Sequence, residues 1–164
     1  MIFKQTILIL GWDLDGNATP FGSPLDDAVY LSEKKERFDD QYYQDVDLNI
    51  PAINESYDFE RGKYKINNIN LTVHNLIIDG ERFSDILSQR NFINLPVVVL
   101  WKSQSAVQLK HCFPLYRGII RDIKHDDKKA RITIEDYSEL SLAPTIPIDR
   151  MSTDINVPVE HKGK

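Results

Sequence analysis

Residues 112–138 read CFPLYRGIIRDIKHDDKKARITIEDYS, and this stretch decides the fold class. Two runs rich in β-branched residues flank the polar stretch HDDKK at 125–129, which is the pattern of two antiparallel strands joined by a short turn. We expect each strand to present an apolar face, formed by Ile119, Arg121 and Ile123 on the first and by Ile132 and Ile134 on the second. The hairpin predicts an antiparallel β architecture for the chain around it.

Further strands are expected on the amino-terminal side of this hairpin. The continuous apolar run PVVVLWK at 96–102 is typical of a buried strand. The stretch 63–78, KYKINNINLTVHNLII, alternates with a shift at Asn67–Asn68, which predicts a bulge or a bend. Shorter strand patterns occupy residues 46–50, which stop at Pro51, and residues 2–10, which stop at Gly11.

Helices and arms complete the expected fold. Ser84 is a candidate N-cap before Ile86 and Leu87, Asp79-Gly80 is a turn signal, and residues 137–142 resemble a closing helical turn. Residues 13–45 show no clean period, and the carboxyl-terminal residues are rich in proline. We therefore predict a mostly β protein, an antiparallel β-barrel or β-sandwich with one or two short helices and extended terminal arms. The expected units are a strand plus irregular arm at 1–50, a β domain at 51–148 and a tail at 149–164.

Composition limits the function classes. The 164 residues carry a net charge of −5, which argues against a surface that follows nucleic-acid phosphates. The single cysteine, Cys112, excludes an internal disulfide framework and suits a protein that folds in a reducing compartment. We expect neither a secretory signal in the first thirteen residues nor a membrane helix in LPVVVLW at 95–101, because both apolar runs are short.

The stretch ILILGWDLDGNATP at 7–20 raises the question of catalysis. An apolar strand followed by D-x-D-G is how phosphatases of the haloacid-dehalogenase family begin, with Asp13 as nucleophile and Asp15 as acid and base. The remaining requirements, a βαβ alternation and a later acidic pair for Mg²⁺, are missing from the sequence. The favoured interpretation is an Asx-type turn that ends a strand.

Other chemistry-bearing residues give weak signals. His74, His111, His125 and His161 are not spaced as metal ligands, and His111–Cys112 is interpreted as a surface histidine beside a packed cysteine. The basic stretch EKKER at 33–37 is offset by the acidic pair that follows it, so we expect no specific nucleic-acid binding. The tyrosines of FDDQYYQD at 38–45 suit either packing or contact with a sugar.

Four motifs appear in a characteristic order: RFSDIL at 82–87, WKSQS at 101–105, YRGIIRDIKHDD at 116–127 and ITIEDYSE at 132–139. With this order, the stretch from about Pro51 to Pro147 resembles the N-terminal region of tail hub, or baseplate, structural proteins of tailed bacteriophages, especially those of marine phages. The start ILILGWDLDGNATPFGSP at 7–24 also looks like the start of such chains.

The resemblance implies a virion structural protein without catalysis or cofactors, assembled in the bacterial host cytoplasm into a ring around or below the tail tube. Its partners would be further copies of itself and neighbouring tail proteins, with no membrane insertion. Candidate contact residues are aromatic or expected to be exposed outside strands, namely Phe38, Tyr42, Tyr43, Phe59, Asp126, Asp127, Lys128 and Lys129. The alternatives are a carbohydrate- or receptor-binding β-domain of a phage tail and, less favoured, the phosphatase relative.

Overall fold

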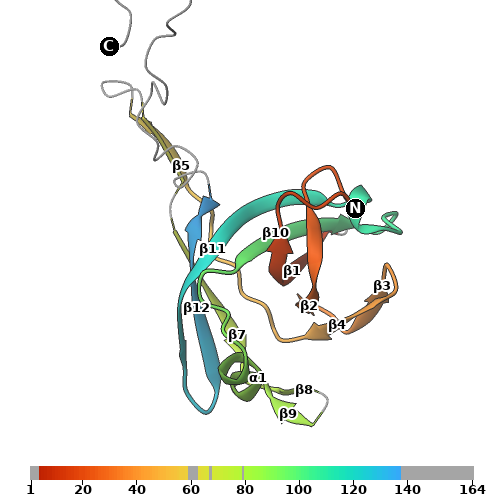
Figure 1. The fold of residues 1–164 in the computed structure, drawn as a ribbon, viewed down its shortest axis with the longest axis vertical. Coiled ribbons are helices and arrows are strands. Elements are labelled where there is room, and N and C mark those ends of the chain that lie inside the picture. Colours follow the sequence, from red (N-terminus) through yellow and green to blue (C-terminus); the bar gives the residue numbers. More distant parts are fainter. Residues whose placement is uncertain (1–3, 59–62, 67, 79, 138–164) are drawn as a thin grey trace, which may run out of the picture.

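The computed structural model describes residues 4–58, 63–66, 68–78 and 80–137, and the structural statements below refer to these residues. The expected helical turn at 137–142, apart from Tyr137, and the expected tail at 149–164 lie outside them. The chain forms, in order, β1 (Lys4–Asp13), β2 (Ser23–Ser32), β3 (Glu36–Phe38), β4 (Gln41–Asp45), β5 (Glu55–Asp58), β6 (Lys63–Ile66), β7 (Ile69–His74), β8 (Ile77–Ile78), β9 (Glu81–Arg82), α1 (Phe83–Gln89), β10 (Pro96–Ser103), a 3-10 turn at Leu109–His111, β11 (Phe113–His125) and β12 (Lys129–Asp136) (Figure 1).

Eight of these strands form one strongly curved sheet. Their order is β3-β4-β2-β1-β10-β11-β12-β7, and every pair is antiparallel except β2 with β4, which is parallel. Residues 46–49 link the two sides of this sheet: the Val46 N–H donates to the Ser32 carbonyl, and the His74 N–H donates to the Val46 carbonyl. Among the described residues the ladder does not close into a continuous barrel, so the prediction of a mostly β fold is confirmed as a sandwich-like curved sheet.

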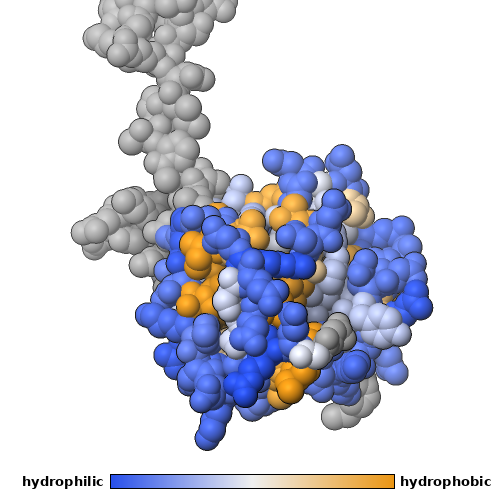
Figure 2. Space-filling view, turned by 60° about the horizontal axis from the view of Figure 1, so that its bottom comes forward, coloured by the Kyte–Doolittle hydropathy of each residue, from blue (hydrophilic) through white to orange (hydrophobic). Residues whose placement is uncertain are grey.

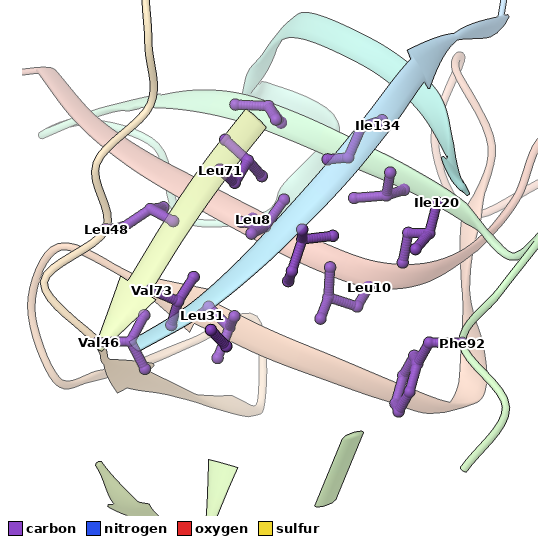
Figure 3. Packing of buried hydrophobic residues seen from close by; sticks show 14 of the residues in the cluster. Leu8, Leu10, Leu31, Val46, Leu48, Leu71, Val73, Phe92, Ile120 and Ile134 are labelled. Carbon is purple, nitrogen blue, oxygen red and sulfur yellow. The ribbon is translucent and has the colours of Figure 1, made fainter. Parts of the chain in front are cut away.

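β1 and β10 are central strands that are buried on both faces. Leu8 and Leu10 of β1 contribute to the main hydrophobic core inside the curved sheet (Figure 3), whereas Ile7 and Ile9 contribute to a second core on the outside. The partner strand β10 divides in the same way, with Val97 and Val99 inside and Val98 and Leu100 outside. Both strands are uninterrupted apolar runs in the sequence because both of their faces are covered. Neither strand has a face toward solvent that would need polar residues.

The hairpin at 113–136 is confirmed, but the predicted face of β11 is wrong. Tyr116 and Ile120 are buried in the main core, whereas Ile119 is half-buried and Arg121 is exposed. The register shifts between Ile120 and Asp122, and this bulge returns Ile123 to the core side. The predicted inward positions Ile132 and Ile134 of β12 are confirmed.

The expectation of an irregular amino-terminal arm is wrong for residues 23–45. They form β2, β3 and β4, all of which belong to the main sheet. β2 was missed because its central residues, Asp26 and Asp27, are charged and exposed and interrupt the apolar pattern. Its outer edge pairs with β4 only at Leu31 and Ser32, and charged residues on such an edge discourage pairing with other chains.

The helix α1 begins two residues earlier than the predicted N-cap at Ser84 implies. Its N-cap is Arg82, which makes no side-chain cap hydrogen bond, and the predicted cap Ser84 lies inside the helix. The cap comes instead from Asn75, whose Oδ1 accepts from the Ser84 N–H at 2.8 Å. No helix in the described part of the chain has the length and apolar character needed to span a membrane.

The chain changes sheet near the irregularity predicted at Asn67–Asn68, of which Asn67 lies outside the described residues. Residues before it form β6, which pairs antiparallel with β5 in a separate two-stranded ribbon, and residues after it form β7 of the main sheet. Figure 1 shows this ribbon projecting away from the body of the molecule. β8 pairs antiparallel with β9, and Gly80 between them has a positive φ of 92°. Asp79 of the turn predicted at Asp79-Gly80 lies outside the described residues.

Candidate interaction surface

The D-x-D-G stretch forms the turn that ends β1. Asp13 is its last residue, and the Asp13 Oδ1 accepts from the Asp15 N–H at 3.1 Å, which is an Asx turn. The Gly16 N–H donates to the Asp13 carbonyl at 3.4 Å. A shallow hollow of about 670 Å³ lies beside this turn, lined by residues 14–20 and by Gly22, Lys110 and His111. The interpretation of this stretch as a strand-ending turn is confirmed.

The phosphatase hypothesis requires Asp13 to follow a parallel strand. β1 instead pairs antiparallel with both of its neighbours, β2 and β10. Across the described ranges, no group of three or more histidine, cysteine, aspartate or glutamate side chains is placed to hold a metal ion. The antiparallel pairing contradicts a haloacid-dehalogenase arrangement of Asp13 and Asp15.

His111 and Cys112 differ in burial as the sequence predicts. Cys112 is buried in the second core, and His111 is exposed. Burial raises the pKa of the Cys112 thiol to about 11, against an opposing effect of the nearby Lys102 ammonium group. A thiol with a raised pKa is a poor nucleophile at neutral pH, so Cys112 acts as a packing residue.

Two of the predicted contact residues, Phe38 and Tyr43, are buried in the second core. This core lies between the outer face of β1 and β10 and the covering hairpin β3–β4. Tyr43 packs edge-to-face against Tyr30, with ring centroids 5.2 Å apart, and is 0% exposed. The prediction that Phe38 and Tyr43 are available for subunit contact is therefore wrong, because the sequence did not reveal the strands that bury them.

Polar contacts fix the β3–β4 hairpin in place. The Lys102 Nζ lies 2.6 Å from the Glu36 Oε2, and the Gln5 Nε2 donates to the Glu36 Oε1 at 2.7 Å. The Lys102 side chain is 13% exposed, and its ammonium group lies 4.8 Å from the centre of the Phe38 ring. At the turn of the hairpin, the Asp39 Oδ2 accepts from the Leu109 N–H at 2.8 Å. The hairpin is thus held by a shielded ion pair as well as by apolar packing.

We expect Tyr43→Phe to raise the free energy of unfolding by about 1 kcal/mol. The Tyr43 hydroxyl is buried and has no hydrogen-bond partner among the described residues, so its removal relieves a desolvation cost. The same burial raises the pKa of Tyr43 above its usual range, with Tyr30 adding to the effect.

Urea denaturation measures this change, and Tyr116→Phe is the matched control. The Tyr116 hydroxyl is also buried but donates to the Ile134 carbonyl at 3.5 Å, so its loss should destabilise the fold. A Tyr43→Phe protein less stable than the unaltered chain would contradict the assignment of an unsatisfied hydroxyl.

Tyr42 is the predicted contact residue of this hairpin that stays accessible. Its exposed fraction is 62%, and the Arg37 guanidinium lies 6.0 Å from its ring centre. Val107, 68% exposed, lines a shallow hollow together with Arg37, Asp39, Asp40 and Gln108. Phe113 is exposed on the following segment and packs against Trp101. We call the exposed residues Tyr42 and Val107, both next to Arg37, the β4 surface.

The turn residues 126–129 are exposed but ordered by local hydrogen bonds. The Asp126 Oδ1 accepts from the N–H groups of Lys128 at 2.7 Å and of Lys129 at 2.8 Å, and these two bonds lower the pKa of Asp126. The Asp126 carbonyl accepts from the Asn75 Nδ2 at 3.0 Å. Asp127 lies 3.8 Å from Arg82, so the turn is tied to the neighbourhood of α1. A subunit contact at these four residues stays a prediction.

A second exposed apolar site lies next to α1. Leu76 and Ile77, at the start of β8, are 44% and 71% exposed. We call this pair the β8 surface. Figure 2, which turns the α1 and β8–β9 end of the molecule forward, shows several separate hydrophobic groups among hydrophilic ones.

The sequence did not single out the two surfaces. Of their four residues only Tyr42 was predicted to make contacts, and Phe59 lies outside the described residues. Ile77 and Phe113 resemble strand residues in the sequence, where an apolar residue ordinarily indicates burial. Ile77 is exposed because it lies in the short β8–β9 hairpin, and Phe113 is exposed because it lies at the start of β11. The local sequence pattern does not reveal either position.

The fold is similar to that of one chain in a solved structure titled "Virion of native gene transfer agent (GTA) particle". The TM-score is 0.50 and the sequence identity is 11%, and the match covers 87% of this chain and 42% of that chain. The present chain thus corresponds to less than half of that chain's length. No protein-family model and no curated protein matches the sequence. At this identity the similarity establishes a shared fold.

Proposed function

We propose that the chain is a non-enzymatic virion structural protein, a tail hub or baseplate component that assembles with copies of itself into a ring. The observation that carries the proposal is the shared fold with a chain of a gene transfer agent virion, over 87% of the present chain. The ordered motifs between 82 and 139, which resemble those of phage tail hub proteins, support the same role.

The exposed apolar sites suit assembly. The β4 surface and the β8 surface lie on different elements, and a closed ring requires two different patches that meet head to tail. In contrast, the edge of β2 beyond its short pairing with β4 carries Pro24, Asp26 and Asp27, which discourage strand pairing between chains. Side-chain surfaces are therefore better suited than this sheet edge to hold neighbouring copies together.

We expect the chain to be present in purified particles and to form rings in solution. Mass spectrometry and antibody labelling of particles test the first point, and size-exclusion chromatography with light scattering and electron microscopy test the second. A strictly monomeric chain that is absent from particles would overturn the proposal. Antibody labelling confined to the tail of the particles would support the tail location, and assembly in the host cytoplasm stays a prediction.

The alternative function is binding of a carbohydrate or receptor at the tail. Tyr42 favours it, because this exposed ring lies beside Arg37 and a shallow hollow of about 380 Å³ lined partly by Arg37. A glycan array distinguishes the two functions: binding that Tyr42→Ala abolishes, by a chain that stays monomeric, would favour the receptor-binding role.

A further inference from the structure

The shallow hollow at the tip of the β3–β4 hairpin has the size of a small ligand site. Its volume of about 380 Å³ lies at the lower end of the range for ligand pockets. Its lining residues are Arg37, Asp39, Asp40, Val107 and Gln108. The Asp39 Oδ2 accepts from the Leu109 N–H at 2.8 Å, so this hydrogen bond joins the two segments that form the hollow.

The turn of the hairpin brings two carboxylates to the hollow. Phe38 pairs with Gln41, so Asp39 and Asp40 form a two-residue turn, and their φ values are 50° and 60°. Positive φ at both central residues is the type I′ arrangement, in which glycine and asparagine are common. Asp40 therefore occupies a position that glycine adopts with less strain, and its carboxylate can be removed without disturbing the turn.

An exposed aromatic ring lies beside the hollow. Arg37 and Tyr42 are opposite each other in the β3–β4 register, so their side chains share one face of the hairpin. The Arg37 guanidinium lies 6.0 Å from the centre of the Tyr42 ring, and its Nη2 lies 3.2 Å from the Asp40 Oδ1. An accessible ring face is thus adjacent to charged hydrogen-bonding groups.

The chemistry of the lining limits the class of ligand. Val107 is the one apolar residue of the lining, which disfavours a hydrocarbon ligand. The two carboxylates outnumber the guanidinium group, which is already paired with Asp40, so the hollow disfavours phosphates and other anions. Within the described ranges, no group of three or more acidic, histidine or cysteine side chains is placed to hold a metal ion. A neutral ligand with several hydroxyl groups fits this lining best.

We propose that the hollow binds a neutral saccharide, with one apolar face of the sugar ring packed on Tyr42. In this arrangement the sugar hydroxyls donate to the Asp40 carboxylate and accept from the Arg37 guanidinium, and the Gln108 amide does both. The aromatic ring contributes apolar contact area at the open side of the hollow. This inference rests on the alternative, carbohydrate-binding role, and it specifies the site and the ligand class.

Asp40→Gly tests the proposal most directly, because it removes a ligand-binding carboxylate at a position that suits glycine. We expect Asp40→Gly and Tyr42→Ala each to raise the dissociation constant for the sugar by at least about tenfold, and the urea midpoint of Asp40→Gly to change little. An array of neutral, sialylated and phosphorylated glycans provides the screen. Nuclear magnetic resonance titration with the methyl glycosides of glucose, galactose and mannose then measures binding, and the amide signals of residues 37–42 and 107–109 should shift.

Asp47→Gly is the matched control. Asp47 also has a positive φ, of 48°, and its exposed carboxylate lies 3.3 Å from the His74 Nε2, but it does not line the hollow. This variant therefore loses a similar exposed contact and should bind the sugar as the unaltered chain does. Binding that survives Asp40→Gly or Tyr42→Ala, a preference for sialylated or phosphorylated glycans, or no binding of any neutral glycan would overturn the proposal.

The outcomes also distinguish this inference from the virion role. If the chain occurs in particles but no neutral glycan binds, the saccharide site fails and the virion role stands. If neutral glycans bind to a chain that is absent from particles, the site stands and the virion role fails. Because Tyr42 also belongs to the β4 surface, the titration uses a protein concentration at which light scattering shows a single species.

Discussion

Gly22→Ala is expected to lower the free energy of unfolding by about 4 kcal/mol, from backbone strain and overpacking together. Gly22 has a φ of +120°, and a Cβ there would lie 2.3 Å from the Asp13 carbonyl oxygen and 2.4 Å from the Trp12 Nε1. The Trp12 ring cannot move freely, because it is 1% exposed and its Nε1 donates to the Phe21 carbonyl at 3.1 Å. The substitution should therefore disrupt the start of the β1–β2 pairing.

Gly80→Ala is the matched control for this prediction. Gly80 also has a positive φ, of +92°, but a Cβ there would meet no atom within 4 Å. Only the backbone strain applies, and the expected cost is about 1 kcal/mol. Urea unfolding followed by tryptophan fluorescence measures both proteins, with an unchanged slope showing that stability alone has changed. Equal costs at the two glycines would show that the contacts around Gly22 are not restrictive.

Asn75→Ala is expected to lower the free energy of unfolding by about 3 kcal/mol, through the loss of three hydrogen bonds at roughly 1 kcal/mol each. The Asn75 Oδ1 accepts from the Ser84 N–H at 2.8 Å, and its Nδ2 lies 3.0 Å from both the Ser84 Oγ and the Asp126 carbonyl oxygen. Ser84 is buried, so its polar groups would lose partners that water does not readily replace.

Asn91→Ala provides the comparison for Asn75. Asn91 is exposed, and its Oδ1 accepts one local hydrogen bond, from the Ile93 N–H at 3.2 Å. Its removal should change stability by less than about 1 kcal/mol. Hydrogen exchange adds a local measurement, because Asn75→Ala should increase exchange in α1 and in residues 126–129 more than in β1. Uniform exchange across the chain would contradict the assignment of Asn75 as the link between these two segments.

The sequence predicted those elements whose signal is local. The apolar runs of β1 and β10, the hairpin β11–β12 and the Asx turn at Asp13 each follow from a few adjacent residues. Continuous apolar runs indicated burial, and the polar stretch at 125–129 indicated the turn, because both patterns arise from strand geometry.

The errors of the sequence-based prediction involve residues whose contact partners are distant in the sequence. Ser84 is a good capping residue by type, but Asn75 reaches the helix from outside and moves the cap. Phe38 and Tyr43 are buried because β3–β4 folds back over β1 and β10, and the ion pair that holds it joins Glu36 to Lys102. The bulge after Ile120 changes which residues of β11 face the core. The alternation of apolar and polar residues alone does not show where the extra residue of a bulge lies.

The candidate surfaces were less predictable than the fold. Tyr42 and Tyr43 are adjacent and identical in type, yet one is 62% exposed and the other is 0% exposed. The sequence therefore did not separate the two tyrosines, and the alternation of side chains along β4 decides which of them is accessible.

The burial of β1 and β10 on both faces has a consequence for sequence variation. Most strands of a curved sheet have one side on which polar replacements are accepted, but residues 7–10 and 97–100 have none, because each is at most 1% exposed. A library that randomises these eight positions should yield folded clones that are almost entirely aliphatic. Positions 26–27 and 126–129 should accept most residue types in the same experiment. The rate of sequence divergence would then differ sharply between neighbouring parts of one sheet.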